Sequence, residues 1–330
     1  MNNFKKIGMT ALAASLVSTS VFAGELTATG SASITVEGYS GSTLQSDTGY
    51  SMADSVVLSG STELDNGMTV SMSFELDSDN PTTSSYDDKS VTISSDALGT
   101  LKFSGHGGSS ATSAVDATAA GNIYDNFDGA EGAAGNGLTS AGVNLLAAGG
   151  GANNLYYSLP AMVDGLAMNA SLNTAGDTGN NALGFNVIYT GVEGLSLTYA
   201  QADIEGGSAA ANGDHTVMNA SYAYGPVTVA YTNSDYSVGA ANSKTLGQEV
   251  TSYAISYTVS DAISLTYGTE TIESGLASEV TDAEYEGITA SYTAGGMTIS
   301  LTSQDAENID HGTAADEDYE YWALGLSFAF

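Results

Sequence analysis

Large apolar side chains alternate with small or polar ones along most of this chain. Within residues 319–330, for example, Trp322, Leu324 and Leu326 alternate with small or hydroxyl-bearing residues. A period of two residues is that of a β-strand with one apolar face. About sixteen segments share this pattern, and we predict strands at residues 26–38, 53–64, 68–77, 89–95, 99–105, 154–160, 166–173, 183–190, 194–202, 215–224, 227–235, 248–259, 262–272, 283–293, 297–305 and 319–330.

The connections between these segments alternate in length. The short turns contain Gly or Asp, which tolerate tight backbone geometry, as in Gly225-Pro226 and Ser260-Asp261. Longer loops rich in Gly, Ser, Asn and Asp lie between them, and the longest, the third, covers residues 106–153. Short turns on one side and long loops on the other are typical of an outer-membrane barrel. We therefore predict an all-β fold, a 16-stranded antiparallel transmembrane β-barrel with short periplasmic turns and long extracellular loops.

Two other β folds compete with this interpretation. A soluble β-sandwich would carry Lys, Glu and Arg on its solvent face, whereas the polar face here is mostly Ser, Thr, Gly and Ala. A secreted β-solenoid would show a fixed sequence repeat, and none is visible. The barrel also requires an uncharged apolar face, and we expect no charge there. Tyr residues near strand ends are predicted to form girdles at the membrane interfaces: Tyr39, Tyr189, Tyr199, Tyr224, Tyr257, Tyr267, Tyr292, Tyr319 and Tyr321.

The composition excludes several classes of protein. The 330 residues include 38 Asp and Glu against 5 Lys and Arg, which gives a net charge of −33. We expect no nucleic-acid partner, because binding to phosphates needs basic side chains. The absence of Cys excludes a disulfide scaffold. The acidic surplus is also compatible with adaptation to a saline habitat, where salt screens repulsion between like charges.

The N-terminus has the pattern of an export signal. Lys5 and Lys6 precede a mostly apolar stretch from Ile7 to Val17, and residues 21–23 fit a small-residue cleavage site. This stretch is shorter than the ~20 residues that a membrane-spanning helix needs. We predict that residues 1–23 are a cleaved signal peptide and that residues 24–330 form the barrel domain.

Three local sequences resemble those of a known family. They are LGTLKFSG at residues 98–105, NLYYSLP at residues 154–160 and ALGLSFAF at residues 323–330. With them, the chain resembles the general porins of Gram-negative bacteria, most of all the alphaproteobacterial type. The resemblance implies a homotrimer surrounded by outer-membrane lipid and lipopolysaccharide. It also implies passive diffusion of ions and small hydrophilic solutes, with the long third loop folded into the pore as a constriction.

The third loop contains the candidate constriction residues Asp116, Asp125, Asp128 and Glu131, and it has no Lys or Arg. We expect these carboxylates to line the constriction and attract cations, as acidic rings do in cation channels. The alternative is a solvated extracellular loop whose acids aid solubility. Asp125, Asp128 and Glu131 also offer the hard oxygen ligands that Ca²⁺ prefers, so a calcium site is a weaker prediction. No other cofactor is expected.

Alternation along the strands places further charges on the pore wall. Lys102 has the opposite phase to its apolar neighbours, and His106 follows in the same phase. Glu37, Glu75 and Glu270 are predicted to face the pore in the same way. The porins that this chain resembles set a basic cluster opposite the acidic loop. Without Arg, this chain offers only Lys102, His106 and Lys89 for it, so we expect a preference for cations.

Two alternatives to a diffusion pore stay open. The first is a structural or adhesive barrel whose loops block the pore. The second is an outer-membrane hydrolase, but the chain has no G-x-S-x-G nucleophile sequence. Its three His residues stand singly, without the spacing of metal ligands. We therefore predict that the protein is not an enzyme.

Overall fold

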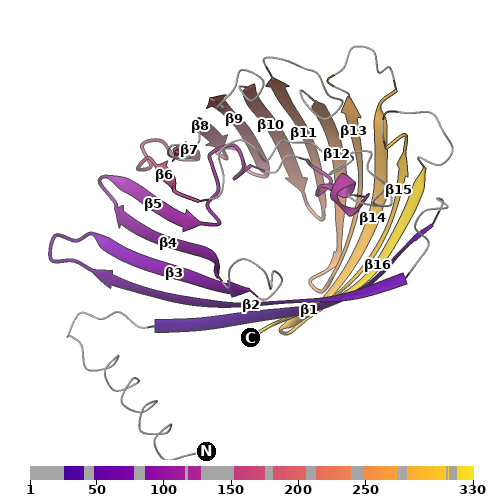
Figure 1. Cartoon of the computed structure of the whole chain (residues 1–330), viewed down its shortest axis with the longest axis horizontal. Helices are drawn as coiled ribbons and strands as arrows, with labels where there is room; N and C mark the ends of the chain where they lie inside the picture. The colour runs from indigo at the N-terminus through magenta and orange to yellow at the C-terminus, as the bar shows by residue number, and fades with distance from the viewer. Residues whose placement is uncertain are drawn as a thin grey trace, which may run out of the picture.

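The structure is a computed structural model, and it describes residues 26–40, 48–77, 86–115, 118–127, 152–174, 181–205, 213–238, 248–273, 275, 281–309, 311 and 318–330. Sixteen antiparallel strands form one closed barrel, in which each strand pairs with its neighbours in sequence (Figure 1). They are β1 (Leu26–Ser40), β2 (Thr48–Glu63), β3 (Thr69–Asp77), β4 (Tyr86–Ser95), β5 (Gly99–His106), β6 (Asn154–Ser158), β7 (Leu166–Thr174), β8 (Asn181–Tyr189), β9 (Leu195–Glu205), β10 (Gly213–Tyr224), β11 (Val227–Val238), β12 (Glu249–Ser260), β13 (Ile263–Glu273), β14 (Ala283–Ala294), β15 (Met297–Glu307) and β16 (Tyr319–Ala329). A short 3₁₀ helix, η1 (Ile123–Phe127), lies between β5 and β6 in the sequence.

The barrel closes between its first and last strands. β1 pairs with β16 from Ser31 opposite Ala329 to Ser40 opposite Glu320. Beyond this ladder, Gly30 and Phe330 exchange two backbone hydrogen bonds of 2.7 and 2.9 Å. Closure leaves no unpaired sheet edge, which is the condition for a sheet to cross a lipid bilayer.

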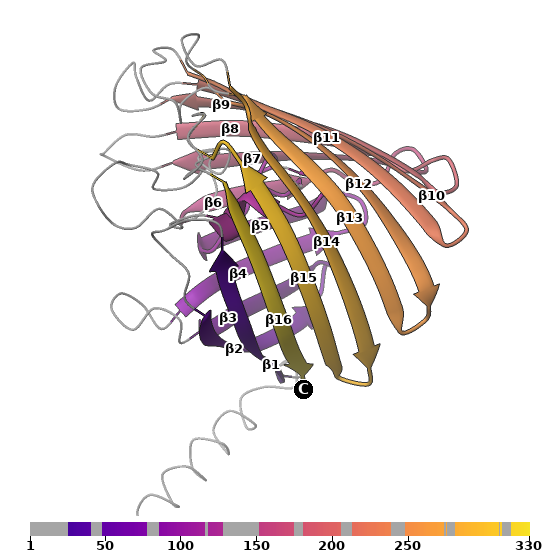
Figure 2. The same ribbon diagram turned by 90° about the vertical axis from the view of Figure 1, so that its right-hand side faces the viewer.

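Short turns join alternate strands at one end of the barrel, and Figure 2 shows several of them near the C-terminus. Gly67 and Gly194 in two of these turns have φ angles of 79° and 75°. Residues with a Cβ rarely adopt this left-handed region, so glycine allows the chain to reverse there. At Gly194, a Cβ would also lie 2.3 Å from the carbonyl oxygen of Ala223. By analogy with other outer-membrane barrels, this is the periplasmic end.

The two faces of the barrel differ as the alternation predicts. Large apolar side chains on the outer face are exposed in the single chain, among them Leu197, Ile255 and Leu301. Ser, Thr and Asn alternate with them on the inner face, where they pair across strands, as in the Ser256–Thr266 and Asn219–Thr232 hydrogen bonds. An apolar exterior with a polar interior is the arrangement of a water-filled membrane barrel.

All sixteen predicted strands are confirmed, with differences at their ends. β9 and β15 continue three and two residues further than predicted, into segments where acidic residues obscure the apolar alternation. β11 also continues three residues further, through Tyr236, Ser237 and Val238. β6 ends at Ser158, two residues earlier than predicted, close to Pro160, which cannot donate to a strand ladder. Within the described residues, no helix is both long enough and apolar enough to cross a membrane. The predicted signal peptide lies outside the described residues.

Candidate functional site

The described part of the third loop runs along the inside of the barrel. Near its start, the Ala111 N–H donates to Ser171 Oγ on β7 at 2.8 Å. Asn186 on β8 donates from Nδ2 to the carbonyl oxygen of Ala111 at 2.7 Å. These bonds identify Ser171 and Asn186 as inner-face residues, and alternation from them assigns the faces of the neighbouring strands.

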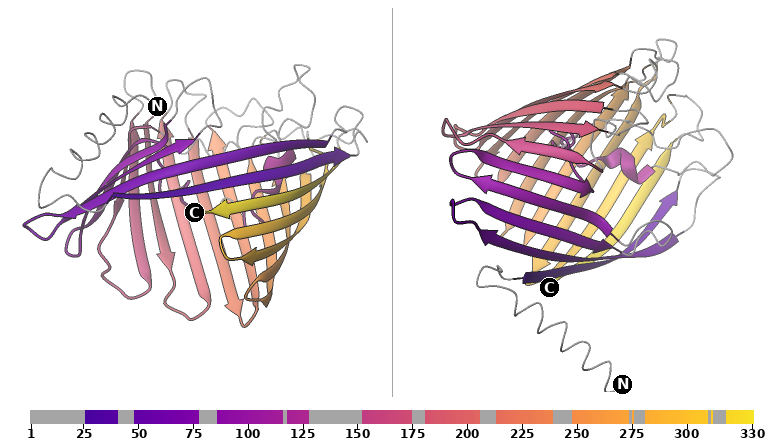
Figure 3. Two further views of the ribbon diagram at one scale, coloured as in Figure 1. Left: turned by 90° about the horizontal axis from the view of Figure 1, so that it is seen from below. Right: turned by 60° about the vertical axis from the view of Figure 1, so that its left-hand side comes forward.

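The loop then crosses to the opposite part of the wall, where η1 packs inside β13–β16 (Figures 1 and 3). Asn126 is held from two strands: its Nδ2 donates to Gln304 Oε1 at 2.8 Å, and its carbonyl oxygen accepts from Tyr39 Oη at 2.7 Å. Phe127 is buried with its ring centroid 5.8 Å from that of Tyr285 and 6.2 Å from that of Tyr321. The segment therefore occupies part of the lumen at a fixed place.

Three predicted wall residues lie on the inner face. Glu37 accepts a hydrogen bond of 2.8 Å from Tyr321 Oη, beside the loop contacts of Tyr39. Glu75 accepts a bond of 2.5 Å from Ser55 Oγ. Lys102 pairs in register with Tyr156, whose hydroxyl lies 3.5 Å from the Nδ2 of inner-face Asn186. The structure thus places one basic and two acidic side chains on the wall formed by β1–β5.

The same wall carries carboxylates that the sequence analysis missed. Asp88 on β4 lies close enough to Lys102 and Glu75 for electrostatic interaction. Asp77 pairs with Ser55, and Glu63 ends β2 at the periplasmic rim. Ser90 pairs with Ser104 on the inner face, so alternation along β4 from Ser90 would have placed Asp88 on that face as well. The inner positions of β1–β5 therefore hold five carboxylates and one lysine, namely Glu37, Glu63, Glu75, Asp77, Asp88 and Lys102.

Glu270 lies on the inner face but is covered. Its side chain is 1% exposed, and its Oε2 accepts the Tyr124 N–H at 3.2 Å. The expectation that Glu270 lines the open pore therefore needs correction, because η1 lies between this carboxylate and the lumen. Periodicity alone shows which face a residue occupies, but not what packs on that face.

His106 and Lys89 also differ from their predicted positions. A bulge at Gly105 shifts the β4–β5 pairing so that His106 lies opposite Lys89, which interrupts the alternation used to place His106 in the pore. His106 is exposed, and its Nδ1 contacts the carbonyl oxygen of Asp87. Lys89 pairs with Phe74 on the outer face, so it does not contribute to a basic cluster on the pore wall.

Asp125 is the one predicted constriction residue that the structure describes. It lies on η1 with its side chain exposed. Although its surface is accessible, the surrounding protein partly desolvates this carboxyl group and raises its pKa, and a hydrogen bond with Asn122 opposes the change. Asp116, Asp128 and Glu131 lie outside the described residues, and the calcium site stays a prediction. Among the described residues, no group of three or more His, Asp or Glu is arranged to hold a metal ion.

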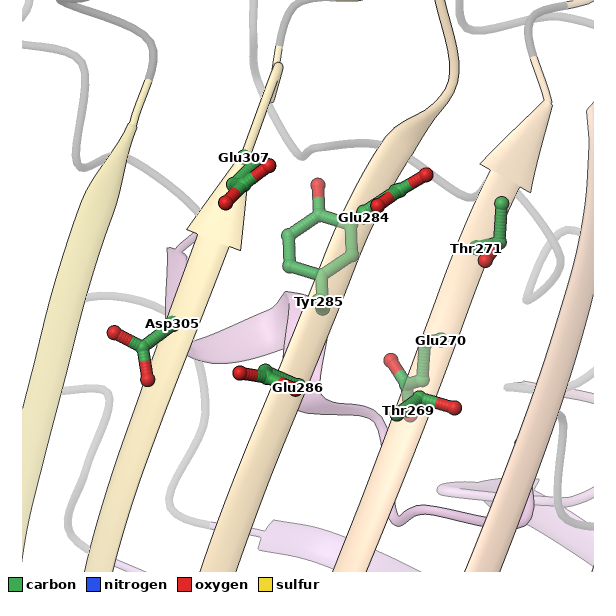
Figure 4. A pocket seen from close by; sticks show the side chains of 8 residues that line it. All are labelled: Thr269, Glu270, Thr271, Glu284, Tyr285, Glu286, Asp305 and Glu307. Atoms are coloured by element: carbon green, nitrogen blue, oxygen red, sulfur yellow. The ribbon is translucent and has the colours of Figure 1, made fainter.

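The outer face carries charges that were not expected. Eleven carboxylates point outward at the loop ends of β9–β16: Asp203, Glu205, Asp214, Asp235, Glu249, Glu273, Glu284, Glu286, Asp305, Glu307 and Glu320. Four of them line a pocket across β13–β15 (Figure 4). Asp54 on β2 also lies in an outward position, between Met52 and Val56. The expectation of an uncharged apolar face is therefore wrong at these positions. The strands β9–β16 continue beyond the apolar band at their loop ends, whereas Asp54 interrupts the apolar series of β2.

The tyrosines predicted to form girdles are divided between the outer and the inner face of the barrel. Six of the nine predicted girdle residues are exposed on the outer face: Tyr189, Tyr199, Tyr224, Tyr257, Tyr267 and Tyr292. Tyr39, Tyr319 and Tyr321 instead point inward. They pack around Phe127 or beside it because the docked loop supplies an apolar surface inside the barrel.

The comparison with known families agrees with this architecture. The sequence matches the family described as Gram-negative porin over residues 8–330. The chain belongs to the Gram-negative porin family. As expected for this porin, the sheet is a closed sixteen-stranded barrel, and such barrels form channels in the outer membrane. No curated protein matches the sequence at a significant level.

Several solved porin structures are similar to this porin in fold. The anion-selective porin from Comamonas acidovorans has a TM-score of 0.67 and 13% identity, covering 93% of this chain and 100% of that one. OmpF of Salmonella typhi, in a complex with daunomycin, has a TM-score of 0.67 and 13% identity, with coverages of 93% and 98%. The in-vitro folded trimer form of OmpT from Vibrio cholerae has a TM-score of 0.64 and 13% identity, with coverages of 93% and 100%. At such identities the likeness concerns the fold alone.

Proposed function

We propose that this porin is a cation-preferring channel for passive diffusion of ions and small hydrophilic solutes. The observation that carries the proposal is the charge of the inner wall, where five carboxylates accompany Lys102 on β1–β5. The inner positions of β6–β12, all within the described residues, carry no Asp, Glu, Lys or Arg. No basic surface on these strands therefore offsets the acidic wall.

The sign of the preference follows from electrostatics in a narrow aqueous tube. Carboxylates along a low-dielectric wall focus a negative potential and raise the local concentration of cations. Similarity in fold does not determine whether a channel prefers cations or anions, since an anion-selective porin is among the similar structures. The charged side chains of this chain support the cation preference.

Planar-bilayer recordings test this proposal. Purified protein should give conductance steps, and under a KCl gradient its reversal potential should have the sign of cation selectivity. Conductance steps with anion selectivity would refute the cation preference but would still support a diffusion channel. A folded protein that gives no steps would refute the channel and favour the structural or adhesive barrel.

We also propose a homotrimer in the outer membrane, in contact with lipid and lipopolysaccharide, formed after removal of residues 1–23. The trimer form of a similar structure supports the assembly. Cross-linking of the folded protein should stop at three subunits, and the N-terminal residue of protein from outer membranes should be Gly24. A monomer would contradict the homotrimer, and an intact N-terminus would contradict the removal of residues 1–23.

A hydrolase is a weaker interpretation of the same geometry. His215 Nε2 and Ser234 Oγ lie 3.0 Å apart, as a catalytic pair would. However, His215 is 2% exposed and Ser234 is fully buried, so a substrate has no access to the hydroxyl. Among the described residues, His215 Nδ1 has no hydrogen-bond partner that would orient the ring. We therefore propose that this pair is structural and that the protein has no hydrolytic activity.

A further inference from the structure

Two neighbouring glycines form a depression in the inner wall beneath the third loop. Gly268 on β13 and Gly287 on β14 are directly paired. Neither has a positive φ, so backbone conformation does not require glycine at these positions. A Cβ at Gly268 would lie 2.4 Å from Ala120 Cβ, and one at Gly287 would lie 3.4 Å from Ile123 Cδ1 and 2.7 Å from Gln304 Cγ. The missing side chains therefore leave the space that the loop occupies.

Glu270 completes this depression. It lies two residues after Gly268 on the same face, and its Oε2 accepts the Tyr124 N–H at the start of the docked turn. A buried carboxylate is unfavourable unless polar groups contact it. The Thr118 side chain and the Ile123 N–H, both in the docked segment, also interact with this carboxylate, although Oε1 itself makes no hydrogen bond of good geometry within the described residues. On the adjacent strand, Ser252 Oγ accepts the Ala120 N–H at 3.0 Å.

We propose that Gly268, Gly287 and Glu270 form a seat that fixes how far the third loop projects into the lumen, and that this seat thereby sets the width of the pore. These are positioning residues: they act on permeating solutes only through the loop. The inference rests on the proposed channel function, because pore width has a functional consequence only in an open channel.

The first test changes the shape of the seat. Gly268→Ala places a methyl group where Ala120 lies, and carbon atoms need ~3.5–4 Å of separation, so the loop must move about 1 Å toward the pore axis. Single-channel conductance should fall by roughly a tenth to a third. Gly325→Ala is the matched control, since the added Cβ would meet only the hydroxyl side chain of Ser300.

The second test distinguishes the role of Glu270 as a hydrogen-bond acceptor from the role of its negative charge. Glu270→Gln keeps an oxygen for the Tyr124 N–H, whereas Glu270→Ala leaves that N–H unpaired. Hydrogen exchange across residues 118–127 should accelerate roughly tenfold in the alanine variant and stay near wild type in the glutamine variant. Open-channel current noise should follow the same order. Because Glu270 is covered, the glutamine variant should also keep the wild-type reversal potential, whereas Glu75→Gln should shift it.

The outcomes distinguish this inference from the proposed function. Hydrogen exchange reports on the seat even if the wild-type protein does not conduct, so it decides the structural part alone. Equal effects of the two Glu270 variants on exchange would overturn the role of its acceptor oxygen. Unchanged conductance in a folded Gly268→Ala channel would overturn the link between the seat and pore width.

Discussion

At the scale of single residues, Lys102 is the basic side chain on an otherwise acidic wall. It lies near Asp88, so its charge offsets part of the negative potential there. Lys102→Gln should therefore strengthen cation preference, raising the K⁺ to Cl⁻ permeability ratio about twofold. The measurement is the reversal potential under a KCl gradient. Lys89→Gln on the outer face is the control, and an equal shift in both variants would contradict the assigned faces.

A second residue-scale prediction concerns pH and Asp125. Partial desolvation by the surrounding protein raises the pKa of this carboxyl group above its ordinary value of 3.8, so on acidification it loses its charge earlier than a free Asp does. Cation preference should decline as pH falls through this raised pKa. Protonation also removes a charge that disfavours burial, so the docked loop should not loosen in that range. Asp125→Asn should flatten this part of the reversal-potential profile, whereas Asp96→Asn in a periplasmic turn should leave it unchanged.

At the scale of elements, alternation predicted the strands because one face of each must meet lipid and the other water. Position near a strand end, the criterion for the tyrosine girdles, misplaced Tyr39, Tyr319 and Tyr321, since it treats the barrel interior as uniformly aqueous. Phe127 lies far from these tyrosines in sequence, yet the docked loop covers part of the inner wall with it. Such long-range contacts have no local signature in the sequence. The bulge that displaced His106 does have one in Gly105, because a glycine inside a strand pattern often marks a bulge.

The closing pair of strands offers an element-scale prediction. Trp322, the single tryptophan, lies over Gly38 on the outer face, where a Cβ would come within 2.8 Å of its Nε1. Gly38→Val should displace the indole, shift its fluorescence emission and destabilise the β1–β16 pairing by ~1–3 kcal/mol. Thermal unfolding followed by that fluorescence measures both effects. Gly49→Val on β2 is the control, because a Cβ there meets no atom within 4 Å.

At the scale of the whole molecule, the two surfaces of the barrel sort the acidic residues into different environments. The net charge was readable from composition, but its distribution between faces was only partly so. Alternation correctly placed Glu37 and Glu75 inside, whereas the outward carboxylates of β9–β16 lie where the strands extend past the apolar band. Composition alone would assign every carboxylate the same influence on ions, and the structure indicates two populations.

The two populations can be compared directly by removing four charges from each. Replacing the inner set with amides should move the permeability ratio severalfold toward unity at ~0.1 M salt, because these groups border the ion path. The inner set is Glu37, Glu75, Asp77 and Asp88, and the outer set is Glu284, Glu286, Asp305 and Glu307. The outer set should have less than about a quarter of that effect, since the barrel wall separates it from the lumen and salt screens exposed charges over a Debye length of ~10 Å. Equal shifts in reversal potential would show that net charge, rather than its placement on the inner wall, governs selectivity.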